Sequence, residues 1–175
     1  LGERSSDYKI RSSPGVGSWA DVPWLAILNP KIAKNTQEGL YPVFLFSADG
    51  SGVYLSLNQG TSKPRQILGS RKAKEQIEHI KTQSIVKIPR LKGWGLDSID
   101  LKANSSLARS YEEANIQARF YPADGIPSEE DLVEDLLSLV DIYSQSEELL
   151  TGLLNENGDK GTDIISPPVL SPSVK

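Results

Sequence analysis

The sequence predicts an α+β fold: a single domain in which a curved, mixed or mostly antiparallel β-sheet is flanked by helices. Residues 14–61 contain three apolar, aromatic-rich runs separated by polar or glycine-containing connections, a pattern typical of paired antiparallel strands. Residues 66–83 and 128–144 carry apolar positions at helical spacing, with charged residues between them. At 175 residues, the chain is long enough to bury a sizeable core without a disulfide or metal.

The first half of the chain supplies most of the predicted strands. They cover residues 8–11, 22–28, 40–46 and 53–57. The Asp-Gly-Ser-Gly sequence at residues 49–52 favours a tight hairpin turn between the last two. Pro23 has no amide hydrogen to donate to a ladder, so we expect it at the start or edge of its strand.

The basic middle of the chain predicts one amphipathic helix over residues 66–83. Its expected buried face consists of Ile67, Ala73, Ile77 and Ile80. Residues 84–88 then read as a connection or a short strand, and residues 89–95 as a basic loop carrying Trp94. The alternating residues 99–102 and the imperfectly alternating residues 111–121 predict two later strands.

The clearest helix is expected at residues 128–144, and a break could be followed by more helix up to residue 154. Ser128 and Asp131 resemble a capping box, with Asp in place of Glu, and acidic residues suit a helix N-terminus. The Gly, Pro and Ser content of residues 155–175 predicts a flexible linker or tail. The expected division is therefore a domain at residues 1–154 and a tail at residues 155–175.

Composition excludes several classes of protein. The chain has no Cys, which removes disulfides, thiolate nucleophiles and zinc–thiolate sites. It has neither a secretory signal nor an apolar run of membrane length, so we expect a soluble, cytoplasmic protein without a membrane partner. The net charge is −4, but residues 62–110 carry 11 Lys and Arg against 4 Asp and Glu. That segment could form a local positive face or simply balance the acidic helix.

Catalytic patterns are weak, and the sequence predicts no catalytic residues, no metal and no cofactor. The single histidine, His79, falls in the basic helix and has no marked nucleophile to serve. Asp100 and Lys102 match the D-x-K fragment of metal-dependent nucleases, but no suitably spaced carboxylate precedes them. A small nuclease using this pair is the third-ranked hypothesis.

Because catalytic patterns are weak, the aromatic residues and the nearby basic residues point mainly to binding of nucleic acid. Reading a single base requires π-faces for stacking and cations on the phosphates. The candidate faces are Trp24, Tyr41, Tyr54 and Trp94. Composition alone does not separate this reading from ordinary core packing of the same rings.

Two linked motifs sharpen this reading. Gly15-x-Gly17-x-Trp19 is followed by Pro23-Trp24, and then by Gly39-Leu40-Tyr41-Pro42-Val43. Over residues 14–61, and more weakly over residues 111–143, the chain resembles the N-terminal DNA-recognition domain of the McrB family. That family supplies the specificity subunit of McrBC-type, modification-dependent (type IV) restriction in phage defence.

The resemblance implies binding of duplex DNA that contains 5-methylcytosine or 5-hydroxymethylcytosine, with the modified base flipped into an aromatic pocket. The pocket positions fall on Trp24, Tyr41 and Leu45, with Tyr111 as the candidate for a later pocket tyrosine. The turn that approaches the gap left by the base comprises Gly15, Val16 and Gly17. Val16 stands where the family has a tyrosine, so Trp19 or Trp94 would fill the gap, or the modification or the flipping geometry differs.

The same reading assigns roles to the basic segment and to a partner. The expected phosphate contacts are Lys63, Arg65, Arg71, Lys72 and Lys92. Cleavage or NTPase activity is expected on an effector domain or nuclease subunit, so this domain would be no enzyme itself. The alternatives are a protein-interaction module docking through residues 128–144, or a reader of a different DNA modification.

Overall fold

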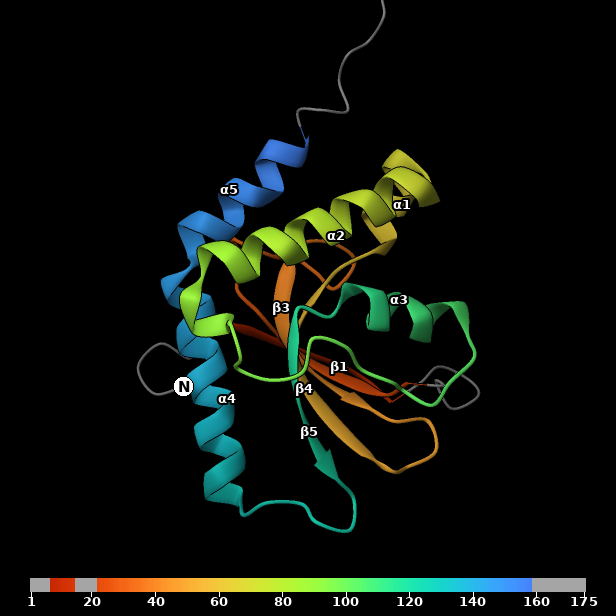
Figure 1. Ribbon diagram of the computed structural model, residues 1–175, viewed down its shortest axis with the longest axis vertical. Helices are drawn as coiled ribbons and strands as arrows, with labels where there is room; N and C mark the ends of the chain where they lie inside the picture. The colour runs from red at the N-terminus through yellow and green to blue at the C-terminus, as the bar shows by residue number, and fades with distance from the viewer. Residues whose placement is uncertain (1–6, 15–21, 159–175) are drawn as a thin grey trace, which may run out of the picture.

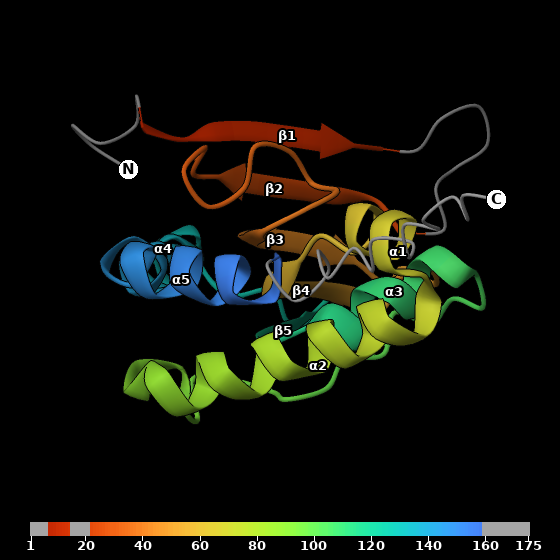
Figure 2. The same cartoon turned by 90° about the horizontal axis from the view of Figure 1, so that it is seen from above.

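The computed structural model describes residues 7–14 and 22–158, which form one open antiparallel sheet with helices around it (Figure 1). The strands follow each other across the sheet in chain order, β1-β2-β3-β4-β5 (Figure 2). They are β1 (Lys9–Ser13), β2 (Trp24–Leu28), β3 (Leu40–Phe46), β4 (Gly52–Gln59) and β5 (Gln117–Pro122). Every neighbouring pair is antiparallel, which confirms the predicted α+β fold class.

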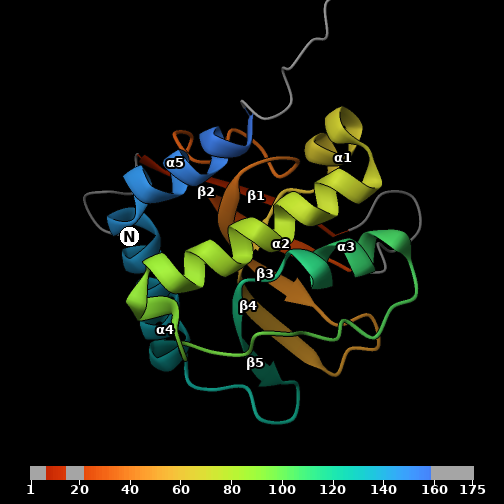
Figure 3. The same ribbon diagram turned by 45° about the horizontal axis from the view of Figure 1, so that its top comes forward.

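Helices of the described residues cover both faces of this sheet. They are α1 (Ser62–Leu68), α2 (Ser70–Lys87), the 3₁₀ turn η2 (Pro89–Leu91), α3 (Ser106–Ala114), α4 (Glu129–Gln145) and α5 (Glu147–Gly158). Figure 3 shows α2 extending from the α4 side of the molecule to α1 and α3. Among these helices, none combines the length and the apolar composition needed to cross a bilayer.

Strict alternation along β3 and β4 divides the core in two. Tyr41, Val43 and Leu45 point to one face, where α3 packs, and we call this the α3 face. Leu40, Leu55 and Leu57 point to the other face, which α2, α4 and α5 cover, and we call this the α4 face. Both faces are apolar because both are covered, so these strands read as nearly continuous hydrophobic runs.

The hairpin between β3 and β4 turns where the sequence predicts it. Gly50 has a φ of +74°, a conformation that side chains other than glycine rarely adopt. The Asp49 carboxylate accepts a hydrogen bond from the amide of Ser51 at 2.9 Å, which closes the turn from the side chain. The hairpin fixes the register in which Tyr41 lies opposite Asn58 and Leu45 opposite Tyr54.

The predicted helix at residues 128–144 is confirmed as α4. The Ser128 hydroxyl accepts a hydrogen bond from the amide of Asp131 at 3.2 Å, as the capping pattern predicts. Leu139 and Tyr143 are buried in the core between α4 and the sheet, and Val140 is buried as well. The helix breaks at Ser146 and resumes as α5, which ends at Gly158.

The single helix predicted over residues 66–83 is wrong in its boundaries. Gly69 has a φ of +78° and separates α1 from α2, which then continues to Lys87 through the predicted connection. Ala73, Ile77 and Ile80 are buried as expected, because they share one face of α2. Ile67 precedes the break and is 68% exposed, so it does not continue that face.

Two predicted strands are also corrected. Residues 99–102 do not form a strand; Leu101 is fully buried, and its carbonyl accepts a hydrogen bond from the amide of Ala48. Residues 111–121 are split between the end of α3 and the strand β5. The side chain of Ser105 caps α3 by accepting a hydrogen bond from the amide of Ala108, so this stretch begins as a helix.

The Tyr143 hydroxyl ties α4 to two elements of the sheet. It donates to the carbonyl of Leu40 at 2.8 Å and accepts from the amide of Asn29 at 3.3 Å, in buried surroundings. Burial raises the pKa of this phenol well above its ordinary value. The hydroxyl therefore stays neutral and can both donate and accept.

We expect Tyr143→Phe to lower the free energy of unfolding by about 1 to 3 kcal/mol, because it leaves a buried carbonyl and a buried amide without partners. Urea denaturation measures the change. The matched control is Tyr121→Phe, whose hydroxyl donates to Asp135, a carboxylate that also binds Arg119. Asp135 keeps a partner in that variant, so an equal loss in the two proteins would contradict the role of Tyr143.

Candidate nucleic-acid interface

The four residues predicted to line a base pocket lie in one apolar cluster on the α3 face. Trp24 on β2 and Leu45 on β3 are opposite each other in the sheet. Tyr41 lies further along β3, and Tyr111 comes from α3 above the sheet. Residues from three elements that are distant in sequence are therefore brought together, as the pocket prediction requires.

The members of this cluster differ in how far solvent can reach them. Tyr41 is 1% exposed and Leu45 is fully buried, whereas Trp24 and Tyr111 are half-buried. The Tyr41 hydroxyl donates to the carbonyl of Thr36 at 2.8 Å. Burial, above all, raises the pKa of Tyr41 well beyond its usual range, and burial also raises the pKa of Tyr111. The cluster therefore presents neutral rings and apolar side chains.

A row of small side chains crosses the centre of the α3 face. Strand register places Ala26 opposite Val43, Val43 opposite Ser56, and Ser56 opposite Ala118. Bulkier residues lie on one side of this row, where Leu45 pairs with both Trp24 and Tyr54. The row forms a shallow floor between larger side chains, and the apolar residues that α3 buries above it, Ala108 and Ala114, are also small.

Buried polar groups join α3 to this floor, and sequence reasoning missed them. The Ser56 hydroxyl donates to the Asn115 side-chain carbonyl at 2.8 Å. The Asn58 amide donates to the backbone carbonyl of Tyr111 at 3.0 Å and to Ser56 at 3.3 Å. Ser56, Asn58 and Asn115 are all fully buried. The signal available in the sequence was the pair of polar residues at alternate positions of an otherwise apolar strand.

The predicted intercalating turn, Gly15, Val16, Gly17 and Trp19, falls outside the described residues. Its two flanks are described. Ser13 at the end of β1 pairs with Trp24 at the start of β2, and Val22 is buried in the α3-face cluster. Both described flanks of residues 15–21 therefore lie at the Trp24 end of β2.

Trp94, the other candidate for filling the gap, belongs to the opposite core. It is 8% exposed and packs in the α4-face cluster. The Arg119 guanidinium lies 4.5 Å from the ring centroid, a cation–π contact. The Arg119 side chain also donates to the Trp94 backbone carbonyl at 3.0 Å. The structure does not bring Trp94 together with Trp24 and Tyr41.

The five predicted phosphate contacts are of two kinds. Three form ion pairs within the domain: Lys63 with Glu38 at 2.5 Å, Arg65 with Glu113 at 2.9 Å, and Arg71 with Glu75 at 3.1 Å. The exposed Lys72 and Lys92 form no ion pair with any described residue. Lys72 and Lys92 therefore offer their full charge to a ligand, whereas the other three must exchange a carboxylate for a phosphate.

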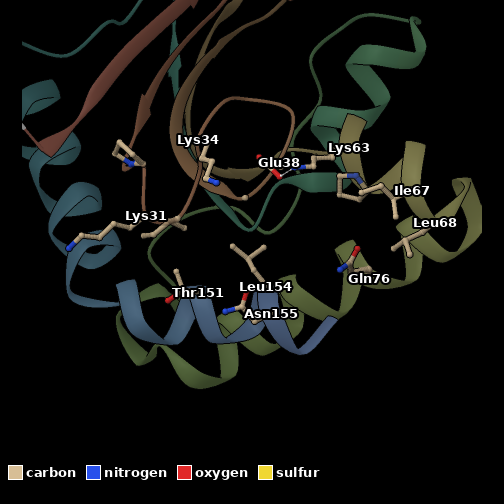
Figure 4. A pocket seen from close by; sticks show the side chains of 14 residues that line it. Lys31, Lys34, Glu38, Lys63, Ile67, Leu68, Gln76, Thr151, Leu154 and Asn155 are labelled. Carbon is tan, nitrogen blue, oxygen red and sulfur yellow. Dashed lines mark ion pairs between the residues drawn. The ribbon is translucent and has the colours of Figure 1, made fainter. Parts of the chain in front are cut away.

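A cavity of about 440 Å³ lies between the β2–β3 connection, α1, α2 and α5. Figure 4 shows Ile67, Leu68 and Leu154 on its walls and the Lys63–Glu38 ion pair at its side. None of the four predicted pocket residues lines it. No aromatic side chain of the described residues lines this cavity, so the faces on which a base could stack are those of the α3-face cluster.

Asp100 and Lys102, the pair that matches the nuclease fragment, form an ion pair with each other. The Lys102 ammonium lies 2.6 Å from an Asp100 carboxylate oxygen, and this hydrogen bond lowers the pKa of Asp100 from its ordinary value. Within residues 7–14 and 22–158, no three His, Asp or Glu side chains gather in a way that would hold a metal ion. His79 lies exposed on α2.

One comparison with known proteins identifies the family. The family described as "MrcB-like, N-terminal domain" matches residues 1–148, which is most of the chain and includes both faces of the sheet. Neither a curated protein nor a solved structure matches. The chain therefore belongs to the MrcB-like N-terminal domain family, a McrB-type DNA-binding module of restriction systems.

Proposed function

We propose that this domain binds duplex DNA containing 5-methylcytosine or 5-hydroxymethylcytosine, flips the modified base into the α3-face cluster, and so directs a restriction effector to the site. The observation that carries the proposal is the convergence of Trp24, Tyr41, Leu45 and Tyr111 in one cluster. Membership in a family of DNA-binding domains supports DNA as the ligand. The pairing of Ser13 with Trp24 places the described end of β1 next to the cluster.

The chemistry of the cluster suits a flipped pyrimidine. Stacking on an aromatic side chain contributes about 1 to 3 kcal/mol per base, while flipping costs a few kcal/mol, so two rings offset most of that cost. A buried methyl group adds about 0.8 kcal/mol, which is enough to bias binding towards the modified base. The half-buried Trp24 and Tyr111 would meet the base first, and Tyr41 and Leu45 would lie deeper.

Trp24→Ala should weaken binding to a methylated duplex by about 1 to 3 kcal/mol and leave binding to the unmodified duplex unchanged, because only the flipped base stacks on this ring. Fluorescence anisotropy with duplexes differing only in the methyl group measures both affinities. The matched control is Phe46→Ala, which removes an exposed ring from β3, the strand next to Trp24. Equal affinity of the unchanged protein for both duplexes would rule out the methylcytosine assignment.

Lys72→Glu should lower affinity by a similar factor for every duplex, modified or not, because phosphate contacts carry no sequence information. The slope of log affinity against log salt should become shallower by about 0.9 for each phosphate that the variant no longer neutralises. Lys34→Glu makes the same charge change at an exposed lysine outside the predicted set. If both variants lose affinity and slope equally, net charge rather than a specific interaction of Lys72 is responsible.

A protein-interaction module is the second candidate, and the outer face of α4 favours it. Val133 and Leu137 are 45% and 41% exposed and lie among acidic residues. On this reading the aromatic cluster is core alone. A complete lack of mobility shift with methylated DNA at low salt would favour docking through α4 over DNA recognition.

A further inference from the structure

Helix α3 is held over the aromatic cluster by small apolar side chains, by the half-buried Tyr111 and by several polar contacts. Its fully buried apolar side chains are Ala108 and Ala114, whereas Leu107 is 48% exposed. Small side chains bury little apolar surface, so the hydrophobic effect contributes less here than under α4. The polar contacts of α3 therefore contribute substantially to holding it in place.

One of those contacts is an exchangeable ion pair with the basic segment. A Glu113 carboxylate oxygen lies 2.9 Å from the Arg65 guanidinium, and its other oxygen lies 3.5 Å from the Lys74 ammonium. Arg65 also donates to the hydroxyl of Ser110, one turn earlier on α3. The Arg65, Lys74 and Glu113 side chains are 29%, 68% and 36% exposed, so an incoming ligand can reach all three.

The sheet side of α3 is attached by buried groups. Asn58 and Ser56 bind the Tyr111 carbonyl and the Asn115 side chain from below, out of reach of solvent. Arg65, Lys74 and Glu113 thus form an exchangeable contact on the solvent side of α3, which we call the latch. The buried hydrogen bonds of Ser56 and Asn58 form a second, fixed attachment on the sheet side. Tyr111, a predicted pocket wall, is two residues before Glu113 on the same helix.

This arrangement bears on base entry, an inference that rests on the proposed function. Tyr41 and Leu45 are 1% and 0% exposed, so a flipped base reaches them only if their cover is displaced. Tyr111 and Ala108 of α3 belong to that cover. Entry of a base into the cluster therefore requires breaking some of the contacts that hold α3 against the sheet.

We propose that Glu113 is a positioning residue that keeps α3 closed over the cluster until DNA phosphates take Arg65 and Lys74 from it. Phosphate and carboxylate compete for the same guanidinium donors, and both bind them in bidentate fashion. A partly exposed ion pair is weak enough to be exchanged. Arrival of the duplex backbone would thereby loosen the wall of the pocket that receives the base.

The test compares Glu113→Gln with Glu75→Gln in the full chain. Both substitutions remove one negative charge next to the basic segment, but Glu75 pairs with Arg71 within α2 and does not bond to α3. Each should tighten binding to an unmodified duplex by about twofold, since each removes one charge that repels phosphate. For Glu75→Gln, the gain in affinity should be the same with the methylated duplex. For Glu113→Gln, the gain should be larger with the methylated duplex than with the unmodified one, because a base can enter the cluster only after α3 is displaced.

Hydrogen exchange of the α3 amides tests the latch without DNA. Glu113→Gln should speed exchange over residues 106–114 by about fivefold, the effect expected for losing weak ion pairs, while Glu75→Gln leaves it unchanged. Added NaCl should speed the same exchange in the unchanged protein but not in Glu113→Gln, because salt screens the ion pair. Thermal melting of each variant confirms that it is folded.

Base recognition and the role of Glu113 in holding α3 are refuted by different results. Equal binding of methylated and unmodified duplexes by the unchanged protein would refute base recognition, and with it the part played by Glu113 in recognition. Identical α3 exchange in Glu113→Gln and Glu75→Gln would refute the latch and leave base recognition standing.

Discussion

The pairing of β3 with β4 is the constraint on which the rest of the structure depends. Because side chains alternate along both strands, this hairpin provides a surface for each of the two cores. The α4 face is built like an ordinary protein interior, with Leu40, Leu55 and Leu57 under long helices. The α3 face is built differently, with small and polar residues beneath a short helix.

The two faces of the sheet therefore differ in how firmly they are covered. Helices packed through large side chains on the α4 face make the sheet rigid from one side. The solvent side of α3 is held by partly exposed ion pairs, which can be exchanged at modest cost. A sheet braced on one face and lightly covered on the other is suited to receive a ligand on the lightly covered face.

The sequence predicted β2, β3 and β4 well because their apolar runs and turn residues act locally. It failed where the decisive contact is distant or small. Gly69 splits the basic helix, although a single glycine within a helical pattern is usually tolerated. Helix α3 was missed because its buried side chains are alanines, and because the tyrosine and isoleucine of residues 111–121 suggested a strand. Its only clear signal was Ser105 at the N-cap.

The candidate site was predicted in part. The cluster of Trp24, Tyr41, Leu45 and Tyr111 came from the resemblance to the McrB family, and the fold places these residues together. Ion pairing could not be foreseen, because Glu38, Glu75 and Glu113 look like ordinary solvated charges in the sequence. The Ser56–Asn58–Asn115 network could not be foreseen either, since it joins residues about sixty positions apart.

The buried Ser56 and Asn58 also discriminate between alternative strand pairings during folding. A slip of one residue in β4 would turn their side chains into the leucine-rich interior beneath α4, away from Asn115 and the Tyr111 carbonyl that they bind in the native register. The same slip would place Leu55 and Leu57 opposite the polar groups of α3. The buried side chains of Ser56 and Asn58 thus favour the native register of β4 over one that is shifted by a single residue.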